Sequence, residues 1–162
     1  PAKCSESLEV ETGWQDGMLW LRFHLECELA ALELPLPKQP GRCDGLWNHT
    51  CFEAFIGGAL YSEFNFSPSS EWAAYDFSGY REGMRARVIE RDPRIGLDAS
   101  ESHFALEALF DPADLAGNLA LSAVIEEVDG TKSYWALAHP PGKPDFHHPA
   151  CFAATLPPPI TP

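Results

Sequence analysis

Hydrophobic and polar residues alternate with a period of two along most of this chain. Residues 19–26 (LWLRFHLE) carry leucine or phenylalanine at every odd position, and residues 104–110 (FALEALF) show an apolar stripe at even positions. Such alternation is typical of a β-strand with one buried face. The pattern predicts the following core residues: Leu19, Leu21, Phe23, Phe104, Leu106 and Phe110.

Similar segments predict about ten strands, at a spacing typical of sandwiches and barrels. They are residues 8–10, 19–25, 51–56, 61–66, 72–77, 85–90, 104–110, 119–125, 133–137 and 152–156. Asp16-Gly17 and Gly57-Gly58 mark hairpin turns. Helix is expected only as one short turn at Asp111–Leu115, where aspartate can cap and proline fits the first position. The fold class is therefore all-β: a β-sandwich of mainly antiparallel strands.

The domain organisation is expected to be simple. The chain has no internal repeat and no linker long enough to divide it, so residues 1–162 are expected to form a single domain. Most of the 15 prolines fall between the predicted strands, and residues 157–162 have the composition of an extended proline-rich tail.

The net charge narrows the choice of partners. With 24 acidic and 11 basic residues the chain carries a net charge of −13, and no cluster of lysine and arginine reverses the sign locally. A protein this negative repels phosphate groups, so neither nucleic acid nor an anionic membrane is an expected partner. A neutral or cationic ligand fits better.

The N-terminus and the cysteines indicate the compartment. The first residues lack the apolar stretch of a signal peptide, and no apolar run is long enough to span a membrane. The five cysteines form no C-x-x-C pair. We expect a cytoplasmic protein with mostly free thiols, and a Cys43–Cys51 disulfide is the alternative.

Catalytic motifs are absent from the sequence. It contains no G-x-S-x-G, G-x-G-x-x-G, phosphate-binding glycine loop or H-E-x-x-H, and no spacing marks a nucleophile with its base. Aromatic residues make up 12% of the chain, which is more than a core of this size needs. The chain is therefore expected to bind a ligand rather than to act as an enzyme.

The first segment rich in chemically versatile side chains is residues 42–55. It runs from a turn containing Trp47 into a strand on which His49, Glu53 and Phe55 share one face. Glu53 is expected to be either solvent-facing, or buried with fixed partners, or in contact with a ligand.

The second segment covers residues 61–81. Glu63 and Asn65 share a strand face with Tyr61, and Trp72 and Arg81 follow. A carboxylate and an amide beside an aromatic ring suit a sugar, because the ring covers the C–H patch while the planar polar groups bind hydroxyls. The alternative for Trp72 is core packing, since large aromatic residues are mostly buried.

The third segment, residues 134–149, holds three of the six histidines within ten positions, stiffened by four prolines. A rigid loop loses little entropy when it binds a ligand. His139, Asp145 and His147 are also candidates for a metal site, although their spacing matches no closed zinc pattern. A haem iron would need one ligand from this loop and another such as Met84 or Met18.

We expect the three segments to converge on one binding site, with Arg81 and Asp145 paired inside it. The predicted ligand-binding residues are Trp47, His49, Asn65, Trp72, Arg81, His139, Lys143, Asp145 and His147. The structural alternative is that His147 and Glu53 only tie loops to strands, because buried polar groups need partners.

The same segments resemble the DOMON-like domains, which are related to the family 9 carbohydrate-binding modules. The resemblance lies in Trp47 through Glu53 to Phe55, in residues 64–68 (FNFSP) and in residues 146–152 (FHHPACF). It implies an immunoglobulin-like or jelly-roll sandwich that binds sugars, or haem as in the cytochrome branch. His49 and Thr50 replace acidic residues of that pattern, so its calcium sites are not carried over.

These arguments favour a non-catalytic module that binds a neutral polar small molecule, most plausibly a carbohydrate. No cofactor or metal is expected. The alternatives are a haem-binding or redox domain, and a small protein with a metal held by histidine and aspartate.

Overall fold

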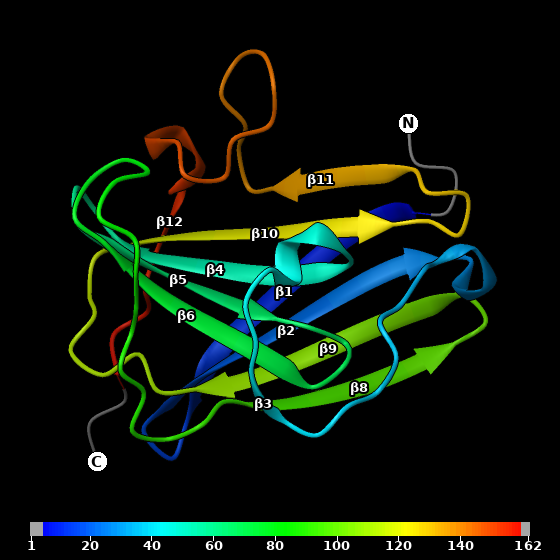
Figure 1. Ribbon diagram of the computed structural model, residues 1–162, viewed down its shortest axis with the longest axis horizontal. Coiled ribbons are helices and arrows are strands. Elements are labelled where there is room, and N and C mark those ends of the chain that lie inside the picture. The colour runs from blue at the N-terminus through cyan, green and yellow to red at the C-terminus, as the bar shows by residue number, and fades with distance from the viewer. Residues whose placement is uncertain (1–4, 160–162) are drawn as a thin grey trace.

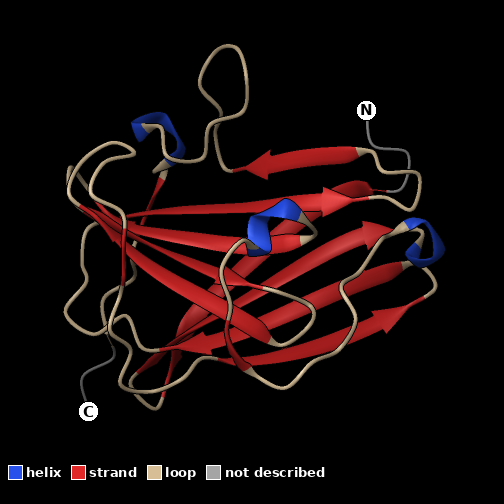
Figure 2. Cartoon of the chain, viewed as in Figure 1, coloured by secondary structure: helices blue, strands red, loops and turns tan. Residues whose placement is uncertain are grey.

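The computed structural model describes residues 5–159 of the protein. Cys4 and the last three residues of the predicted tail, 160–162, lie outside the described residues. The chain forms two β-sheets that pack face to face, so the predicted β-sandwich is confirmed (Figures 1 and 2). The described part contains no α-helix, only three short 3-10 turns: η1 (Leu29–Ala31), η2 (Leu46–Asn48) and η3 (Pro149–Cys151).

The smaller sheet has four antiparallel strands in the order β1-β2-β9-β8. Their bounds are β1 (Ser5–Gln15), β2 (Met18–Cys27), β9 (His103–Phe110) and β8 (Arg94–Ser100). Asp16 and Gly17 join β1 to β2 with φ values of 51° and 75°. Positive φ at both central positions matches a two-residue hairpin turn that continues the strand twist.

The larger sheet has eight strands, six of them in the order β11-β10-β4-β5-β6-β3. Their bounds are β11 (Lys132–Ala136), β10 (Asn118–Glu126), β4 (Cys51–Gly57), β5 (Tyr61–Phe66), β6 (Glu71–Phe77) and β3 (Gly41–Arg42). The remaining two are β12 (Ala154–Thr155), paired with β10, and β7 (Arg85–Ala86), paired with β6. The β3–β6 pair is parallel, and the other pairs are antiparallel.

The main core lies between the two sheets. All six residues predicted for it are at most 2% exposed, which confirms the prediction. Aromatic rings connect the layers: Phe23 of the smaller sheet contacts Phe52 of the larger one at 5.1 Å between centroids, and Phe64 contacts Phe110 at 4.6 Å. Alternate residues of each strand therefore fill the space between the sheets.

The outer face of the larger sheet is also buried, although the smaller sheet lies on its other side. A second cluster forms there, centred on Phe55, Tyr61 and Tyr75, and it includes Cys151 from the C-terminal segment. Both faces of β4 and β5 are consequently covered, and both strands are buried almost throughout. This covered outer face carries the candidate site.

Three local predictions differ from the structure. The strand expected over 85–90 is only Arg85–Ala86. The strand β8 was not predicted, although Ile95, Leu97 and Ala99 alternate along it, and most of its side chains are exposed. Asp111–Leu115 forms a turn rather than a helix: Asp111 Oδ1 accepts from the backbone N–H of Ala113 at 2.8 Å. Ala113 has φ of 53°, which ends any helical course.

The thiols of Cys43, Cys51 and Cys151 are free, so the alternative Cys43–Cys51 disulfide does not form. Within residues 5–159, no helix has the length and apolar character needed to cross a membrane.

The expectation that Trp72 belongs to the ligand site is wrong. Its side chain is 3% exposed and packs in the core between the sheets, because even-numbered residues of β6 point inward while Ala73 and Tyr75 point outward. The guanidinium of Arg42 lies 4.6 Å from its ring centroid. Trp72 is thus a core residue on the opposite face of the sheet from the third segment.

We expect Trp72→Ala to lower the free energy of unfolding by about 3–5 kcal/mol, because it leaves a cavity between the sheets. Trp47→Ala is the matched control: Trp47 is 39% exposed, and its loss should cost less than about 1 kcal/mol. Urea unfolding followed by circular dichroism measures both values. Equal losses for the two variants would contradict this assignment.

Candidate functional site

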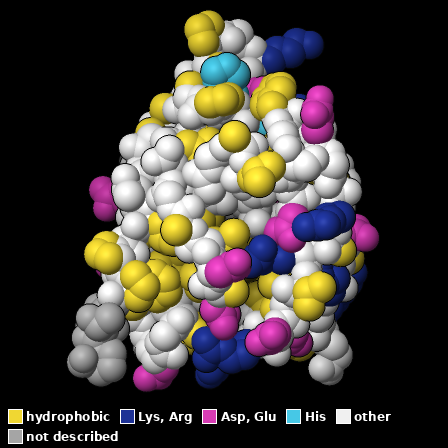
Figure 3. All heavy atoms as spheres, turned by 90° about the vertical axis from the view of Figure 1, so that its left-hand side faces the viewer, with side chains coloured by type: hydrophobic (Ala, Val, Ile, Leu, Met, Phe, Trp, Pro, Cys, Tyr) yellow, Lys and Arg dark blue, Asp and Glu magenta, His cyan; other side chains and the backbone are white. Residues whose placement is uncertain are grey.

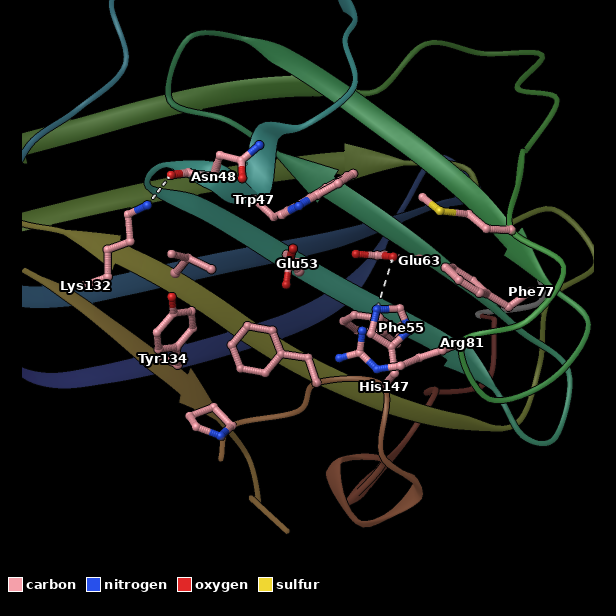
Figure 4. A pocket seen from close by; sticks show the side chains of 14 residues that line it. Trp47, Asn48, Glu53, Phe55, Glu63, Phe77, Arg81, Lys132, Tyr134 and His147 are labelled. Carbon is pink, nitrogen blue, oxygen red and sulfur yellow. Dashed lines mark hydrogen bonds and ion pairs between the residues drawn. The ribbon is translucent and has the colours of Figure 1, made fainter. Parts of the chain in front are cut away.

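A cavity of about 440 Å³ opens on the outer face of the larger sheet. Its volume lies within the range of small-molecule sites, about 300–1,000 Å³. Side chains from the central strands form its floor, and parts of all three segments of the sequence contribute to its walls (Figure 4). The lining residues are Trp47, Asn48, Glu53, Phe55, Glu63, Phe77, Arg81, Met84, Val124, Lys132, Tyr134, Pro144, Phe146 and His147.

Two carboxylates and one amide make up the polar floor. Glu53 on β4 pairs in register with Asn65 on β5, and odd-numbered residues of both strands point outward. When the Asn65 amide is oriented to satisfy its hydrogen bonds, its nitrogen lies between the carboxylates and donates to Glu53 Oε1 at 3.2 Å and to Glu63 Oε1 at 3.1 Å. The Ser122 hydroxyl of β10 donates to Glu53 Oε2 at 3.1 Å. One amide therefore links the two acids into a single polar unit.

Burial keeps these acids protonated to unusually high pH. Removal from water raises the pKa of Glu63 to about 7, against the hydrogen bond from Asn65 and the charge of Arg81. Burial also raises the pKa of Glu53 well above its usual range, and the nearby Glu63 carboxylate raises it further. Each effect disfavours the charged form. The pair consequently holds at least one proton near neutral pH.

His147 stands in the wall beside this floor. Its ring makes edge contacts with Phe55 at 5.1 Å and Phe77 at 5.0 Å, and its Nδ1 lies 2.8 Å from the Tyr61 hydroxyl. Its Nε2 lies 3.8 Å from Glu63 Oε2. Burial, followed by the charge of Arg81, lowers the pKa of His147 to about 4. The imidazole is therefore neutral at neutral pH, and its contact with Glu63 is not an ion pair.

Tyr61 joins this histidine to the loop of Arg81. Its hydroxyl oxygen accepts the backbone N–H of Arg81 at 3.1 Å. The hydroxyl proton finds its acceptor in Nδ1 of His147, which leaves the ring proton on Nε2, facing Glu63. Two loops far apart in sequence are thus held together by one buried side chain.

Arg81 and Asp145 form the ion pair that the sequence predicted. Asp145 Oδ1 accepts from Arg81 Nη2 at 2.8 Å and from Nε at 3.2 Å, and it also accepts the backbone N–H of His147 at 3.2 Å. The Tyr80 hydroxyl donates to the other carboxylate oxygen. Burial acts to raise the pKa of Asp145, but the hydrogen bonds from Tyr80 and Arg81 outweigh it and lower the pKa. This carboxylate is charged and fully engaged behind the cavity wall.

Aromatic side chains face each other across the cavity. Trp47 makes an edge contact with Tyr75, at 6.0 Å, and remains partly exposed. Tyr134 and Phe146 pack together on the other side at 6.1 Å. Figure 4 shows Glu53 and Glu63 between Trp47 on one side and Tyr134 and His147 on the other. The cavity therefore combines apolar walls with an acidic floor.

The structure brings together five of the nine predicted site residues. Trp47, Arg81 and His147 line the cavity, Asn65 lies under its floor, and Asp145 lies behind its wall.

The other four predicted residues do not line the cavity. His139 and Lys143 are exposed on the loop at its rim, where the His139 ring lies 6.4 Å from that of Phe146. His49 is exposed and precedes β4, and its Nδ1 contacts Glu126 Oε2 at 2.8 Å instead of facing the cavity. Trp72 belongs to the inner face, as described above.

Sequence reasoning missed several wall residues. Lys132 of β11 lies outside the three segments, and its Nζ donates to the Asn48 carbonyl oxygen at 2.7 Å. Tyr134, also of β11, is the first residue of the third segment but was not selected as a ligand-binding residue. Phe146 was visible within the third segment as the aromatic residue between Asp145 and His147. Its position there is the signal that would have identified it.

The metal alternative gains no support from the geometry. Among residues 5–159, no group of three or more histidine, cysteine, aspartate or glutamate side chains is arranged to hold a metal ion. Asp145 is occupied by Arg81 and Tyr80, and the ring of His147 turns toward Tyr61 and Glu63.

Surface charges of opposite sign are interspersed around this end of the molecule. On the face shown in Figure 3, lysine and arginine side chains lie beside aspartate and glutamate side chains. Arg87 pairs with Asp76 and Arg91 with Asp111, each at 2.9 Å. This face therefore offers no extended basic patch for a polyanion.

Comparison with known proteins identifies a shared fold. No protein-family model matches the sequence, and no curated protein matches it. The structure is similar to the crystal structure of a "putative carbohydrate-binding protein" from Bacteroides uniformis, with a TM-score of 0.58 and 12% sequence identity. The match covers 90% of this chain and 77% of that chain. At this identity the similarity is one of fold, and the resemblance to DOMON-like domains stays a prediction.

Glu63 in the floor and His147 in the wall have shifted pKa values, and the two shifts change the free energy of unfolding in opposite directions as pH rises. Folding raises the pKa of Glu63 from 4.5 to about 7. Its contribution to the free energy of unfolding is therefore complete below about pH 4.5 and is lost as pH rises to about 7. The pKa of His147 falls from 6.5 to about 4, so stability increases as pH rises between those values. The two effects oppose each other between about pH 4.5 and 6.5.

We expect Glu63→Gln to remove the loss of stability that ionisation of Glu63 causes as pH rises. Relative to wild type, the variant should gain about 2–3 kcal/mol of unfolding free energy between pH 4.5 and 8. Urea unfolding at both pH values measures the difference. Glu9→Gln, an exposed site on β1, is the control and should gain less than about 0.5 kcal/mol. A difference for Glu63→Gln that does not change with pH would contradict the assignment.

Proposed function

We propose that this protein is a non-catalytic module that binds a carbohydrate in the cavity on the outer face of its larger sheet. The observation that carries the proposal is the arrangement of aromatic walls around a buried floor of planar polar groups. The fold likeness to a protein named for carbohydrate binding agrees with it.

The walls and floor match the two kinds of surface that a sugar ring presents. Partly exposed aromatic residues such as Trp47 and Phe146 can cover the C–H face of a pyranose. The floor oxygens of Glu53 and Glu63 can accept hydrogen bonds from its hydroxyl groups. Asn65 and Ser122 fix both carboxylates in place, so the binding geometry exists before the ligand arrives.

The placement of the two carboxylates argues for binding rather than hydrolysis. In most glycoside hydrolases the two acids flank the scissile bond from opposite sides. Here Glu53 and Glu63 lie on adjacent strands of one floor and share one amide donor. A sugar resting on this floor meets both acids from the same side.

Haem is the second ligand implied by the resemblance, and it fits this cavity poorly. Met84 and His147 both line the cavity, as a methionine–histidine pair of iron ligands requires. However, His147 Nε2 faces Glu63, and the floor has two carboxylates where a flat porphyrin needs an apolar slot. Met18 is buried at the start of β2 and does not line the cavity.

We expect a panel of mono- and oligosaccharides to contain ligands that raise the melting temperature, because a ligand that binds the folded state alone stabilises it. Titration calorimetry then gives the dissociation constant. Trp47→Ala and Phe146→Ala should each weaken binding about tenfold or more by removing a stacking surface. Haemin serves as the competing ligand, with a Soret shift as its readout.

The matched control for these variants is Trp20→Ala. Trp20 is a partly exposed tryptophan on the smaller sheet, where it donates to Glu107, so its loss should leave the affinity unchanged. If no saccharide binds, or if Trp20→Ala weakens binding as much as Trp47→Ala, the cavity is not a carbohydrate site.

A further inference from the structure

The acidic floor of the cavity has no cationic partner among the described residues. Three lining side chains can carry positive charge, and each is engaged elsewhere. Arg81 pairs with Asp145, and Lys132 donates to the Asn48 carbonyl oxygen. His147 stays neutral at neutral pH because burial disfavours its charged form. Neither floor carboxylate therefore forms an ion pair with a cationic side chain among the described residues, and what limits their charge is the proton that burial retains.

One carboxylate oxygen of this floor also lacks a hydrogen-bond donor. The Glu63 side chain accepts from Asn65 through Oε1, whereas Oε2 has its nearest described donor, His147 Nε2, at 3.8 Å. That distance is too long for a hydrogen bond. Glu63 as a whole is 4% exposed and lines the cavity (Figure 4), so this oxygen is an unpaired acceptor on the cavity surface, open to whatever occupies the space.

The chemistry of the missing partner follows from charge and hydrogen bonding together. A hydroxyl group would give Glu63 a donor but would not compensate the charge of its ionised form, so the carboxyl group would keep its proton. An ammonium group offers three N–H donors and one positive charge, and hydrogen bonds between charged groups are the stronger kind. An anionic group would be repelled. The strongly acidic composition, with a net charge of −13, acts in the same direction at long range.

We infer that the sugar bound here carries a free amino group, and that its ammonium binds between the carboxylates of Glu53 and Glu63. This inference rests on the proposed carbohydrate function and narrows it to amino sugars. The aromatic walls contact the sugar ring, and the floor selects the amine. The ligand is then cationic rather than neutral.

Proton release accompanies binding in this arrangement. The groups that face the two carboxylates are Cys51, Tyr61, Tyr75, Arg81 and His147. Burial raises the pKa of Cys51, Tyr61 and Tyr75, so these three stay neutral, while Arg81 stays charged. The proton held by the glutamate pair is the one that an incoming ammonium displaces.

The test compares sugars that differ only at the amino group. Glucosamine, galactosamine and mannosamine are titrated against glucose, galactose and mannose, with N-acetylglucosamine as an uncharged derivative, using calorimetry at about pH 6. Short chitosan and cello-oligosaccharides form a second matched pair. In at least one pair the amino sugar should bind about tenfold or more tightly than its partner. Repeating the titration in buffers of different ionisation enthalpy should reveal proton release.

Two variants test whether the preference for the amino sugar depends on the floor carboxylates. Glu63→Gln and Glu53→Gln keep the side-chain shape, and each should abolish the preference for the amino sugar while still binding the neutral one. Glu9→Gln removes one negative charge from the smaller sheet and should keep the preference. Circular dichroism confirms that each variant is folded.

The outcomes separate this inference from the proposed function. If neutral hexoses bind as tightly as their amino counterparts, the amino-sugar inference is overturned and the carbohydrate function stands. Binding of ethanolamine with the affinity of the amino sugar would also overturn it, because the sugar ring would then contribute nothing. If no sugar of either kind binds, both proposals fail.

Discussion

Everything at the candidate site depends on the burial of both faces of β4 and β5. A strand in a two-layer sandwich normally turns one face to solvent, which would leave Glu53, Glu63 and Asn65 in water. Here loops and the C-terminal segment cover that face, so each polar side chain on it must find a partner inside the protein. The Asn65 amide and the Ser122 hydroxyl donate to both oxygens of Glu53 and to one oxygen of Glu63. The other oxygen of Glu63, Oε2, has no hydrogen-bond donor, and this distinguishes the floor chemically.

The covering segments are themselves organised by a few polar contacts. Tyr61 lies at the centre, with its ring stacked on Phe77 at 4.8 Å and its hydroxyl between the Arg81 backbone and the His147 ring. Asp145 adds a second connection between the same two loops through the Arg81 side chain. Because these loops are tied to the sheet and to each other, the cavity walls have defined positions without any helix to support them.

The sequence predicted the architecture well because the alternation of residues reports burial directly. The stripes over 19–26 and 104–110 correspond to core positions, and both hairpin turns occur at the predicted glycines. The strand β8 was missed: its apolar alternation is short, at Ile95, Leu97 and Ala99, and most of its side chains are exposed.

For the candidate site, the positions of residues along the chain could indicate candidate ligand-binding residues. They could not decide which face of the larger sheet each residue occupies. Trp72 and Asn65 are equally unusual in sequence, yet the parity of their positions on neighbouring strands sends one into the core and the other under the cavity. Lys132 was out of reach because its role arises only when β11 pairs beside β10, whereas Tyr134 lay within the third segment without being selected.

The double burial of the central strands has a consequence for how this protein tolerates substitution. Along β4 and β5, even-numbered residues such as Phe52 and Phe64 fill the space between the sheets, and odd-numbered residues such as Glu53 and Glu63 face the cavity. Neighbouring residues are therefore under two separate physical constraints, one set by the core between the sheets and one set by the cavity. Substitutions in the odd-numbered set can change the chemistry of the cavity while the even-numbered set preserves the fold.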